Sequence, residues 1–273
     1  MTGADRLPAE IAAVLPALVD DLQATLRDRL VGVYLSGSAV TGGYDVGVSD
    51  ADLLVVTRDA VSEADFRSLD RVHARIVERD ATWADRLDIV YVGRQALRDF
   101  RSTEESLAVI SHDEPLHLEG SIAGWLQTWY LFRETGLAVA GPPPAQVIAA
   151  IRDEEFREAI RGYVGELRTT AKTGATPGLL AYAVLSACRA LRTVRTGVPC
   201  SKQDGAKWTG ERHAEWASVI DAALACRLSG GRAGFEDPAE RASAIAIVDA
   251  IAAAVGVVHA PVKGSSPAPV DPP

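Results

Sequence analysis

The chain has 273 residues, 48% of them apolar and 24% charged, so it is long enough to bury one large hydrophobic core or two ordinary ones. Its 37 acidic residues outnumber its 28 basic residues, and the net charge of −9 argues against nucleic acid as the main partner, because phosphate backbones attract basic proteins. No apolar run reaches the roughly 18 residues that a membrane-spanning helix needs. We therefore expect a globular protein with neither a nucleic-acid nor a membrane partner.

The opening residues and the cysteines indicate a cellular compartment. Asp5, Arg6 and Glu10 precede any hydrophobic stretch, so the start of the chain does not resemble a secretory signal. The three cysteines are odd in number and are spaced neither as a zinc site nor as a disulfide framework. These features predict a protein of the reducing cytoplasm.

The first part of the chain alternates between two hydrophobic periods. Apolar residues recur at three- and four-residue steps across 7–30 and again across 60–80, which predicts two amphipathic helices. Short apolar runs at 30–36, 51–57 and 87–92 predict buried strands. Strands and helices are therefore expected to alternate up to about residue 99.

Alanine-rich segments of helical period dominate the rest of the chain, where β-branched runs become scarce. This pattern predicts a helical bundle. The expected helices span residues 122–137, 145–173, 179–196, 214–228 and 239–257.

Proline and glycine mark the expected domain boundaries. The run from Gly141 to Pro144 is the strongest internal break, because proline stops a preceding helix and stiffens the connection to the next element. We therefore expect one domain at 1–142 and a second at 143–258. Residues 259–273 are rich in proline and nearly devoid of large apolar side chains, so they are expected to form a disordered tail.

Three aspartates lie at the starts of expected strands. Asp50 and Asp52 are two residues apart, a spacing that puts both carboxylates on the same face of a strand, about 7 Å apart. The rest of that strand is apolar, where an unpaired charge is costly to desolvate. Mg²⁺, held by one or two carboxylates together with nucleotide phosphates, removes that cost. Asp88 opens the third strand, where it would complete the metal site or take a proton from an attacking hydroxyl.

A glycine-serine turn precedes these acids. Gly37 and Ser38 follow the first expected strand and come before a short segment that can begin a helix. Backbone N–H groups at such a turn bind phosphate oxygens, glycine lets the phosphates approach closely, and the serine hydroxyl adds a donor. The sequence therefore predicts a phosphate-binding turn beside a metal site.

Taken together, these motifs resemble a known family. Gly37-Ser38, Gly42 and the run from Ser49 to Val56 are similar to the signature of polymerase-β-type nucleotidyltransferases, in particular the aminoglycoside adenylyltransferases of the streptomycin/spectinomycin type. Residues 182–189, 196–197, 201–202 and 208 resemble the helical domain that follows in those enzymes. The resemblance implies an α+β fold, with a short mixed β-sheet flanked by helices in the nucleotidyltransferase domain and an α-helical bundle domain behind it.

The same resemblance implies roles for the acids. Asp50 and Asp52 would hold two Mg²⁺ ions, and Asp88 would be a further metal ligand or the catalytic base. In the relatives a glutamate occupies the position of Asp88, so the side chain of this chain is one methylene shorter there.

For the nucleotide, the resemblance implies that Gly37 and Ser38 bind the phosphates of ATP. Arg189 and Lys202 would reach the triphosphate from the helical domain. Cations aimed at a departing pyrophosphate stabilise the transition state.

The expected activity is transfer of AMP from ATP to a hydroxyl of a small cationic acceptor of the aminoglycoside type, with release of pyrophosphate. The acidic net charge favours a polycationic acceptor. Residues 169–179 lack the tryptophan and the acids that streptomycin-modifying relatives carry there, so the particular drug stays open. Two alternatives also stay open: an adenylyltransferase acting on a protein or another metabolite, and a non-catalytic nucleotide-binding regulator of the same fold.

Overall fold

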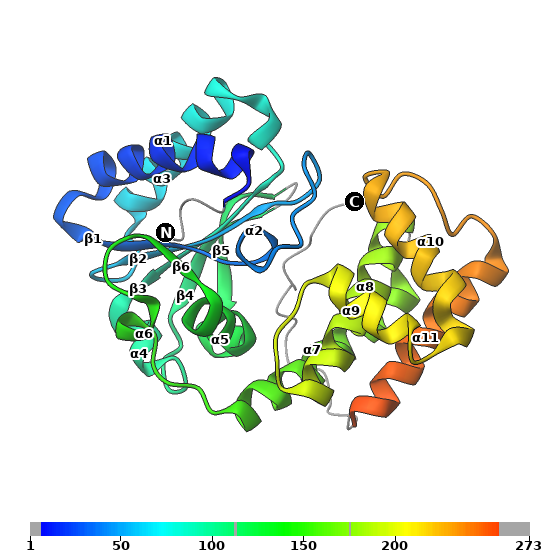
Figure 1. Ribbon diagram of the computed structural model, residues 1–273. Helices are drawn as coiled ribbons and strands as arrows, with labels where there is room; N and C mark the ends of the chain where they lie inside the picture. The colour runs from blue at the N-terminus through cyan, green and yellow to red at the C-terminus, as the bar shows by residue number, and fades with distance from the viewer. Residues whose placement is uncertain (1–6, 112–113, 175, 257–273) are drawn as a thin grey trace. The chain divides into compact units, whose positions relative to one another are not determined.

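The computed structural model describes residues 7–111, 114–174 and 176–256 (Figure 1). Contacts within the chain divide it into two compact units, Met1–Ile151 and Arg152–Pro273. The tail expected at 259–273 lies outside the described residues. Among the described residues, no helix is long and apolar enough to cross a membrane.

The first unit is built on a six-stranded sheet with the strand order β5-β4-β3-β2-β1-β6. β2 and β3 run parallel, whereas the other neighbouring strands run antiparallel. The mixed sheet predicted for this half is confirmed. The strands are β1 Leu30–Leu35, β2 Ala51–Thr57, β3 Leu87–Gly93, β4 Ser106–Ser111, β5 Glu114–Ser121 and β6 Leu137–Ala140.

Helices and short turns connect these strands. The helices of the first unit are α1 Ala9–Leu26, α2 Ser38–Thr41, α3 Glu63–Arg79, α4 Arg94–Asp99, α5 Leu126–Thr135 and α6 Pro144–Val147. Three 3₁₀ turns, η2 Arg27–Arg29, η3 Ala81–Trp83 and η4 Ile122–Trp125, accompany them. α1 and α3 cover one face of the sheet, and α4, α5 and α6 lie on the opposite side (Figure 1).

The two faces of β2 and β3 differ because successive strand residues point to opposite sides. Leu53 and Val55 in β2, with Ile89 and Tyr91 in β3, belong to the core that α1 and α3 complete. Their buried partners on α1 include Leu18. The residues that alternate with these, which include Asp52 and Asp88, therefore face the side of the sheet away from α1 and α3.

Polar contacts fix α3 against α1. Ser62 and Asp65 form a capping box at the start of α3, in which each side chain accepts a hydrogen bond from the backbone N–H of the other. Near its end, Arg79 donates to both carboxylate oxygens of Asp21 on α1. The capping box stabilises the start of α3, and the exposed Arg79–Asp21 pair joins α3 to α1 outside the site described below.

The second unit is the predicted helical bundle. Its helices are α7 Asp153–Thr173, α8 Pro177–Thr196, α9 Lys202–Gly210, α10 Ala217–Leu228 and α11 Pro238–Val255, with the 3₁₀ turn η5 Ala214–Trp216 before α10. α8 packs against each of the other four α-helices, and most of its residues from Leu180 to Leu191 are buried. A helix that is apolar on nearly all sides is suited to this central position.

Several elements differ from the sequence expectations. α4, β4, β5, β6 and α9 were not predicted, and the helix expected at 122–137 is η4 and α5 followed by β6. β6 has the sequence Leu-Ala-Val-Ala, which is ambiguous by itself, and pairing with β1 makes it a strand.

The chain between the two units also differs from the expectation. The helix expected at 145–173 is two helices, α6 and α7, with 148–152 between them. Residues 143–151 pack with the first unit: Arg133 donates to the carbonyl oxygens of Ala145 and Ile148, and the Ala149 N–H donates to Leu97. The division therefore falls after Ile151, whereas the sequence interpretation placed it after residue 142.

Candidate active site

Two aspartates face each other across the parallel pair of strands. Asp52 in β2 and Asp88 in β3 are register partners, so their side chains leave the same face of neighbouring strands, which lie about 4.8 Å apart. Both are half-buried. Burial, and then the charge of Asp52, raise the pKa of Asp88 to about 8. A pKa raised in this way is typical of two neighbouring carboxylates, because the charge of one makes ionisation of the other less favourable.

The glycine turn after β1 lies directly against Asp52. The Ser36 N–H donates to the backbone carbonyl of Asp52 at 3.0 Å. Gly37 has φ +67° and ψ −150°, a conformation that side chains rarely adopt. A Cβ atom on Gly37 would lie 1.7 Å from Oδ2 of Asp52, so glycine is required by both conformation and space. Ser38 begins α2 immediately after this glycine.

Asp50 directly precedes β2 and is only 6% exposed. The next residue, Ala51, donates its N–H to the carbonyl of Arg86, which starts the ladder between β2 and β3. The preceding residue, Ser49, is held through its own carbonyl by the Arg86 side chain. The backbone on both sides of Asp50 is therefore fixed by one residue.

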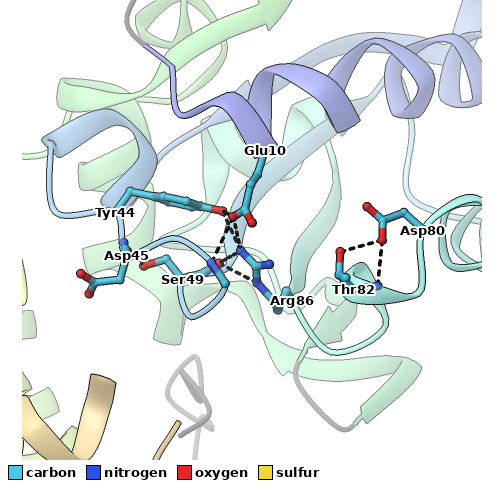
Figure 2. A network of polar contacts seen from close by, with 8 residues as sticks. Glu10, Tyr44, Asp45, Ser49, Asp80, Thr82 and Arg86 are labelled. Carbon is cyan, nitrogen blue, oxygen red and sulfur yellow. Dashed lines mark hydrogen bonds and ion pairs between the residues drawn. The ribbon is translucent and has the colours of Figure 1, made fainter. Parts of the chain in front are cut away.

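A polar network surrounds Arg86 (Figure 2). Its Nη2 donates to Oε2 of Glu10 at 2.8 Å and to the hydroxyl of Tyr44 at 2.7 Å. The Tyr44 hydroxyl in turn donates to Glu10. The hydrogen bond from Arg86 holds the pKa of Glu10 below its usual value. Sequence reasoning gave Arg86 and Tyr44 no role and considered Glu10 only as a charge near the start of the chain.

These acids fit a magnesium site that is shared with a nucleotide. Within residues 7–111, 114–174 and 176–256, no three acidic, histidine or cysteine side chains are grouped closely enough to form a metal site alone. Mg²⁺ in proteins is usually bound by one or two carboxylates, with phosphates and water completing its shell. A divalent cation also relieves the repulsion between Asp52 and Asp88. The oxygen donors present therefore suit Mg²⁺ together with a triphosphate.

The two predicted cations lie near one tyrosine in the second unit. The Lys202 ammonium lies 4.5 Å from the centre of the Tyr182 ring and is largely buried, at 8% exposure. Burial raises the pKa of Tyr182 well above its usual value, while the charge of Arg189 acts in the opposite direction. The hydroxyl groups of Tyr182 and Tyr163 are 2.5 Å apart. Lys202 thus lies against the Tyr182 ring, and Arg189 is close enough for its charge to affect the same tyrosine.

Close packing of α8 and α9 brings this pair together. A Cβ on Gly205 of α9 would lie 2.5 Å from the Cα of Arg189, so the absence of a side chain lets α9 approach α8 at that residue. Ser201 caps α9 by accepting the Asp204 N–H at 3.0 Å. Lys202 is therefore the first residue of a helix, in a segment for which no helix was expected.

The seven predicted site residues thus fall into two groups. Gly37, Ser38, Asp50, Asp52 and Asp88 gather in the first unit, where the end of β1 meets the starts of β2 and β3. The remaining two, Arg189 and Lys202, gather in the second unit.

Comparison with known proteins assigns both units. The family model described as the nucleotidyltransferase domain matches residues 18–113, which include the whole of the first group. The family model described as the aminoglycoside adenylyltransferase C-terminal domain matches residues 146–252, which include both cations. No curated protein matches the chain.

A solved structure has the same fold. The crystal structure of spectinomycin adenyltransferase AAD(9) from Enterococcus faecialis with ATP and spectinomycin matches with a TM-score of 0.70 and 16% sequence identity. The match covers 89% of this chain and 98% of that chain.

The chain is a nucleotidyltransferase, an enzyme with an α+β nucleotidyltransferase domain followed by a helical domain. The predicted fold and enzyme class are confirmed. Within this superfamily it belongs to the aminoglycoside adenylyltransferases, since the two family matches together span most of the chain.

Proposed function

We propose that the enzyme transfers AMP from ATP to a hydroxyl of a small cationic acceptor of the aminoglycoside type, with Mg²⁺ as cofactor and pyrophosphate as product. The observation that carries this proposal is the contact of the Gly37 turn with Asp52, which itself faces Asp88. A phosphate-binding turn and two carboxylates thus meet at one point of the sheet. Membership of the aminoglycoside adenylyltransferases supports the acceptor class.

The turn and the acids bind the nucleotide in this proposal. Backbone N–H groups at Gly37 and Ser38 hold phosphate oxygens of ATP. Asp50 and Asp52 would hold Mg²⁺, which would neutralise charge on the triphosphate and so favour in-line displacement. The bond between the acceptor oxygen and the α-phosphorus forms as the bond to the bridging oxygen of the pyrophosphate breaks.

Asp88 receives the proton of the acceptor hydroxyl in this scheme. A base is most effective when its pKa lies near the working pH, and burial beside Asp52 raises the pKa of Asp88 toward neutrality. The aspartate is one methylene shorter than the glutamate of the relatives, so the acceptor has to bind correspondingly closer to β3.

Arg189 and Lys202 stabilise the departing pyrophosphate. Lys202 is largely buried against Tyr182, where the low local dielectric strengthens the attraction of its charge for an anion. Both cations belong to the unit that matches the aminoglycoside adenylyltransferase C-terminal domain, which supports their role in the family's reaction.

Two observations support a polycationic acceptor, and a third supports a cytoplasmic location. The net charge of −9 favours encounter with such a molecule, and AAD(9), which has the same fold, was crystallised with spectinomycin and ATP. Cys188, Cys200 and Cys226 are free thiols, as expected in a reducing compartment.

Incubation with ATP labelled at the α-phosphate, Mg²⁺ and a panel of aminoglycosides and spectinomycin tests the proposal. We expect a labelled drug and an equal amount of pyrophosphate, and an increased resistance of a susceptible host that is lost with Asp50→Ala. Pyrophosphate release without a modified drug would point to a protein or another metabolite as acceptor. ATP binding with no turnover on any acceptor would identify a nucleotide-binding regulator instead.

A further inference from the structure

Arg86 binds the chain on both sides of Asp50. Its Nε and Nη2 donate to the carbonyl oxygen of Ser49 at 3.0 and 2.8 Å, and its own carbonyl accepts the Ala51 N–H at 2.9 Å. The side chain thus holds the residue before Asp50, and the backbone holds the residue after it. Any large change in the backbone torsion angles of Asp50 would therefore break at least one of these three hydrogen bonds.

Other groups hold the guanidinium of Arg86 in place. Glu10 from α1 and the hydroxyl of Tyr44 both contact Nη2 (Figure 2). The centre of the Trp83 ring lies 4.8 Å from Cζ. The side chain of Arg86 is only 12% exposed. An arginine that is paired, stacked and largely covered has little freedom to move. The two hydrogen bonds that it donates therefore restrain the Ser49 carbonyl.

The loop that Arg86 anchors connects the two motifs of the site. Residues 42–50 connect α2, which follows the Gly37 turn, to the start of β2. Within this loop the Asp45 N–H donates to Oγ of Ser49, and the Ser49 N–H donates to the Asp45 carbonyl. These local bonds join Ser49 to its own loop, whereas the bonds from Arg86 join it to the residue directly before β3.

We propose that Arg86 is a positioning residue, which fixes the Asp50 carboxylate for divalent metal, and that Glu10 and Tyr44 hold Arg86 in the required orientation. The inference rests on the proposed function, because it takes Asp50 as a metal ligand. Arginine suits this task better than lysine because its guanidinium is planar and carries several N–H groups in fixed directions. Nε and Nη2 both donate to the Ser49 carbonyl, and Nη2 also donates to Glu10.

The first experiment measures metal binding by the full-length protein without turnover. Mn²⁺ is titrated into the protein in the presence of a non-hydrolysable ATP analogue, because the carboxylates suit a metal that is shared with a triphosphate, and binding is followed by electron paramagnetic resonance, with Arg86→Lys compared with the unchanged chain. Loss of a group that orients a metal ligand typically weakens metal binding 10- to 100-fold, so we expect the dissociation constant to rise about tenfold. In steady-state assays the Mg²⁺ concentration for half-maximal rate should rise similarly, while the KM for the acceptor stays unchanged.

Arg79→Lys is the matched control. Arg79 also pairs with a carboxylate of α1, Asp21, but on the exposed outer side of α3, so its substitution should leave Mn²⁺ binding unchanged. Tyr44→Phe removes one hydroxyl of the network and covers the case in which Arg86→Lys does not fold. For Tyr44→Phe we expect a roughly threefold weaker binding of Mn²⁺, less than the loss of the orienting residue itself.

The outcomes separate this inference from the proposed function. If Asp50→Asn weakens Mn²⁺ binding but folded Arg86→Lys and Tyr44→Phe do not, the positioning role of Arg86 is wrong and the metal site stands. If Asp50→Asn also leaves Mn²⁺ binding unchanged, the metal assignment fails, and the role of Arg86 fails with it.

Discussion

Asp88 lies directly opposite Asp52, at the same register position of the parallel strands β2 and β3. Because the two side chains leave the same sheet face, each carboxylate changes the electrostatic environment of the other. The pKa of Asp88 is raised by its burial and by the negative charge of Asp52. The acid pair is therefore electrostatically strained until a proton or a cation joins it.

Asp52→Asn should lower the pKa of Asp88 and reduce AMP transfer on the order of a hundredfold or more. Removing the neighbouring anion eliminates one of the two causes of the raised pKa, although burial keeps it above the ordinary value. Removing a metal ligand costs at least as much as removing a group that only orients one. Carboxyl-carbon NMR titration and initial rates check the two effects, with Asp80→Asn as control, since Asp80 only caps Thr82. An unchanged Asp88 pKa would contradict the coupling.

Gly37→Ala should both destabilise the first unit and abolish activity. Its φ of +67° alone costs about 1 to 3 kcal/mol for a residue with a side chain, and the new methyl would displace the Asp52 carboxylate. Gly42→Ala is the matched control, because φ is +83° there but no atom lies within 4 Å of a Cβ. We expect Gly42→Ala to lose about 1 kcal/mol while keeping activity. Urea unfolding and AMP-transfer rates distinguish the two variants.

Lys202→Met should lower kcat/KM for ATP on the order of tenfold, because it removes the cation that we propose for the departing pyrophosphate while an apolar side chain against Tyr182 is kept. Lys207→Met, on an exposed position of the same helix, should have no effect. Equal effects of the two variants would mean that general electrostatic attraction, rather than a placed cation, accounts for the loss.

Stability should fall in mild acid because of His73. This side chain is buried between α3 and β3, bonded through Nε2 to the Tyr91 hydroxyl at 2.6 Å, and burial lowers its pKa to about 4. The unfolded chain, with a histidine pKa near 6.5, binds more protons than the folded chain between pH 6.5 and pH 4, so stability rises with pH across that window. This group contributes a loss of about 2 kcal/mol between pH 7.5 and pH 5.

His73→Gln keeps a hydrogen-bonding partner for Tyr91 but cannot titrate. The difference in unfolding free energy between pH 7.5 and pH 5, measured by urea denaturation, should therefore shrink by about 2 kcal/mol in this variant. The same pH dependence in both proteins would show that carboxylates, not His73, govern acid stability.

β1, β2 and β3 could be predicted because each is a short apolar run in the sequence. An unbroken apolar run bounded by polar residues indicates a buried strand from its own sequence, and the acids at 50, 52 and 88 stand out because they lie at the polar starts of such runs. β5 and β6 gave no such pattern, since an edge strand is defined mainly by its partner.

The Arg86 network was beyond sequence reasoning for a different reason. Arg86 contacts Glu10, 76 positions away, and Tyr44, 42 positions away. Each is a single polar residue without a repeating pattern, so only the folded chain shows that they meet beside Asp50. The roles of Arg189 and Lys202 came from family resemblance. Only the folded chain shows that Lys202 lies against the Tyr182 ring and that the charge of Arg189 acts on the same tyrosine.

The alternation of β2 has a consequence for how this enzyme can change over evolution. A slip of one residue in β2 would turn Asp52 toward the core under α1 and α3 and send Leu53 to the opposite side. An insertion ahead of β2 therefore has to be absorbed entirely within the 42–50 loop, upstream of the Ser49 carbonyl that Arg86 holds. Lineages of this fold should accordingly vary in loop length before Ser49 and keep the count from there to Asp52 constant.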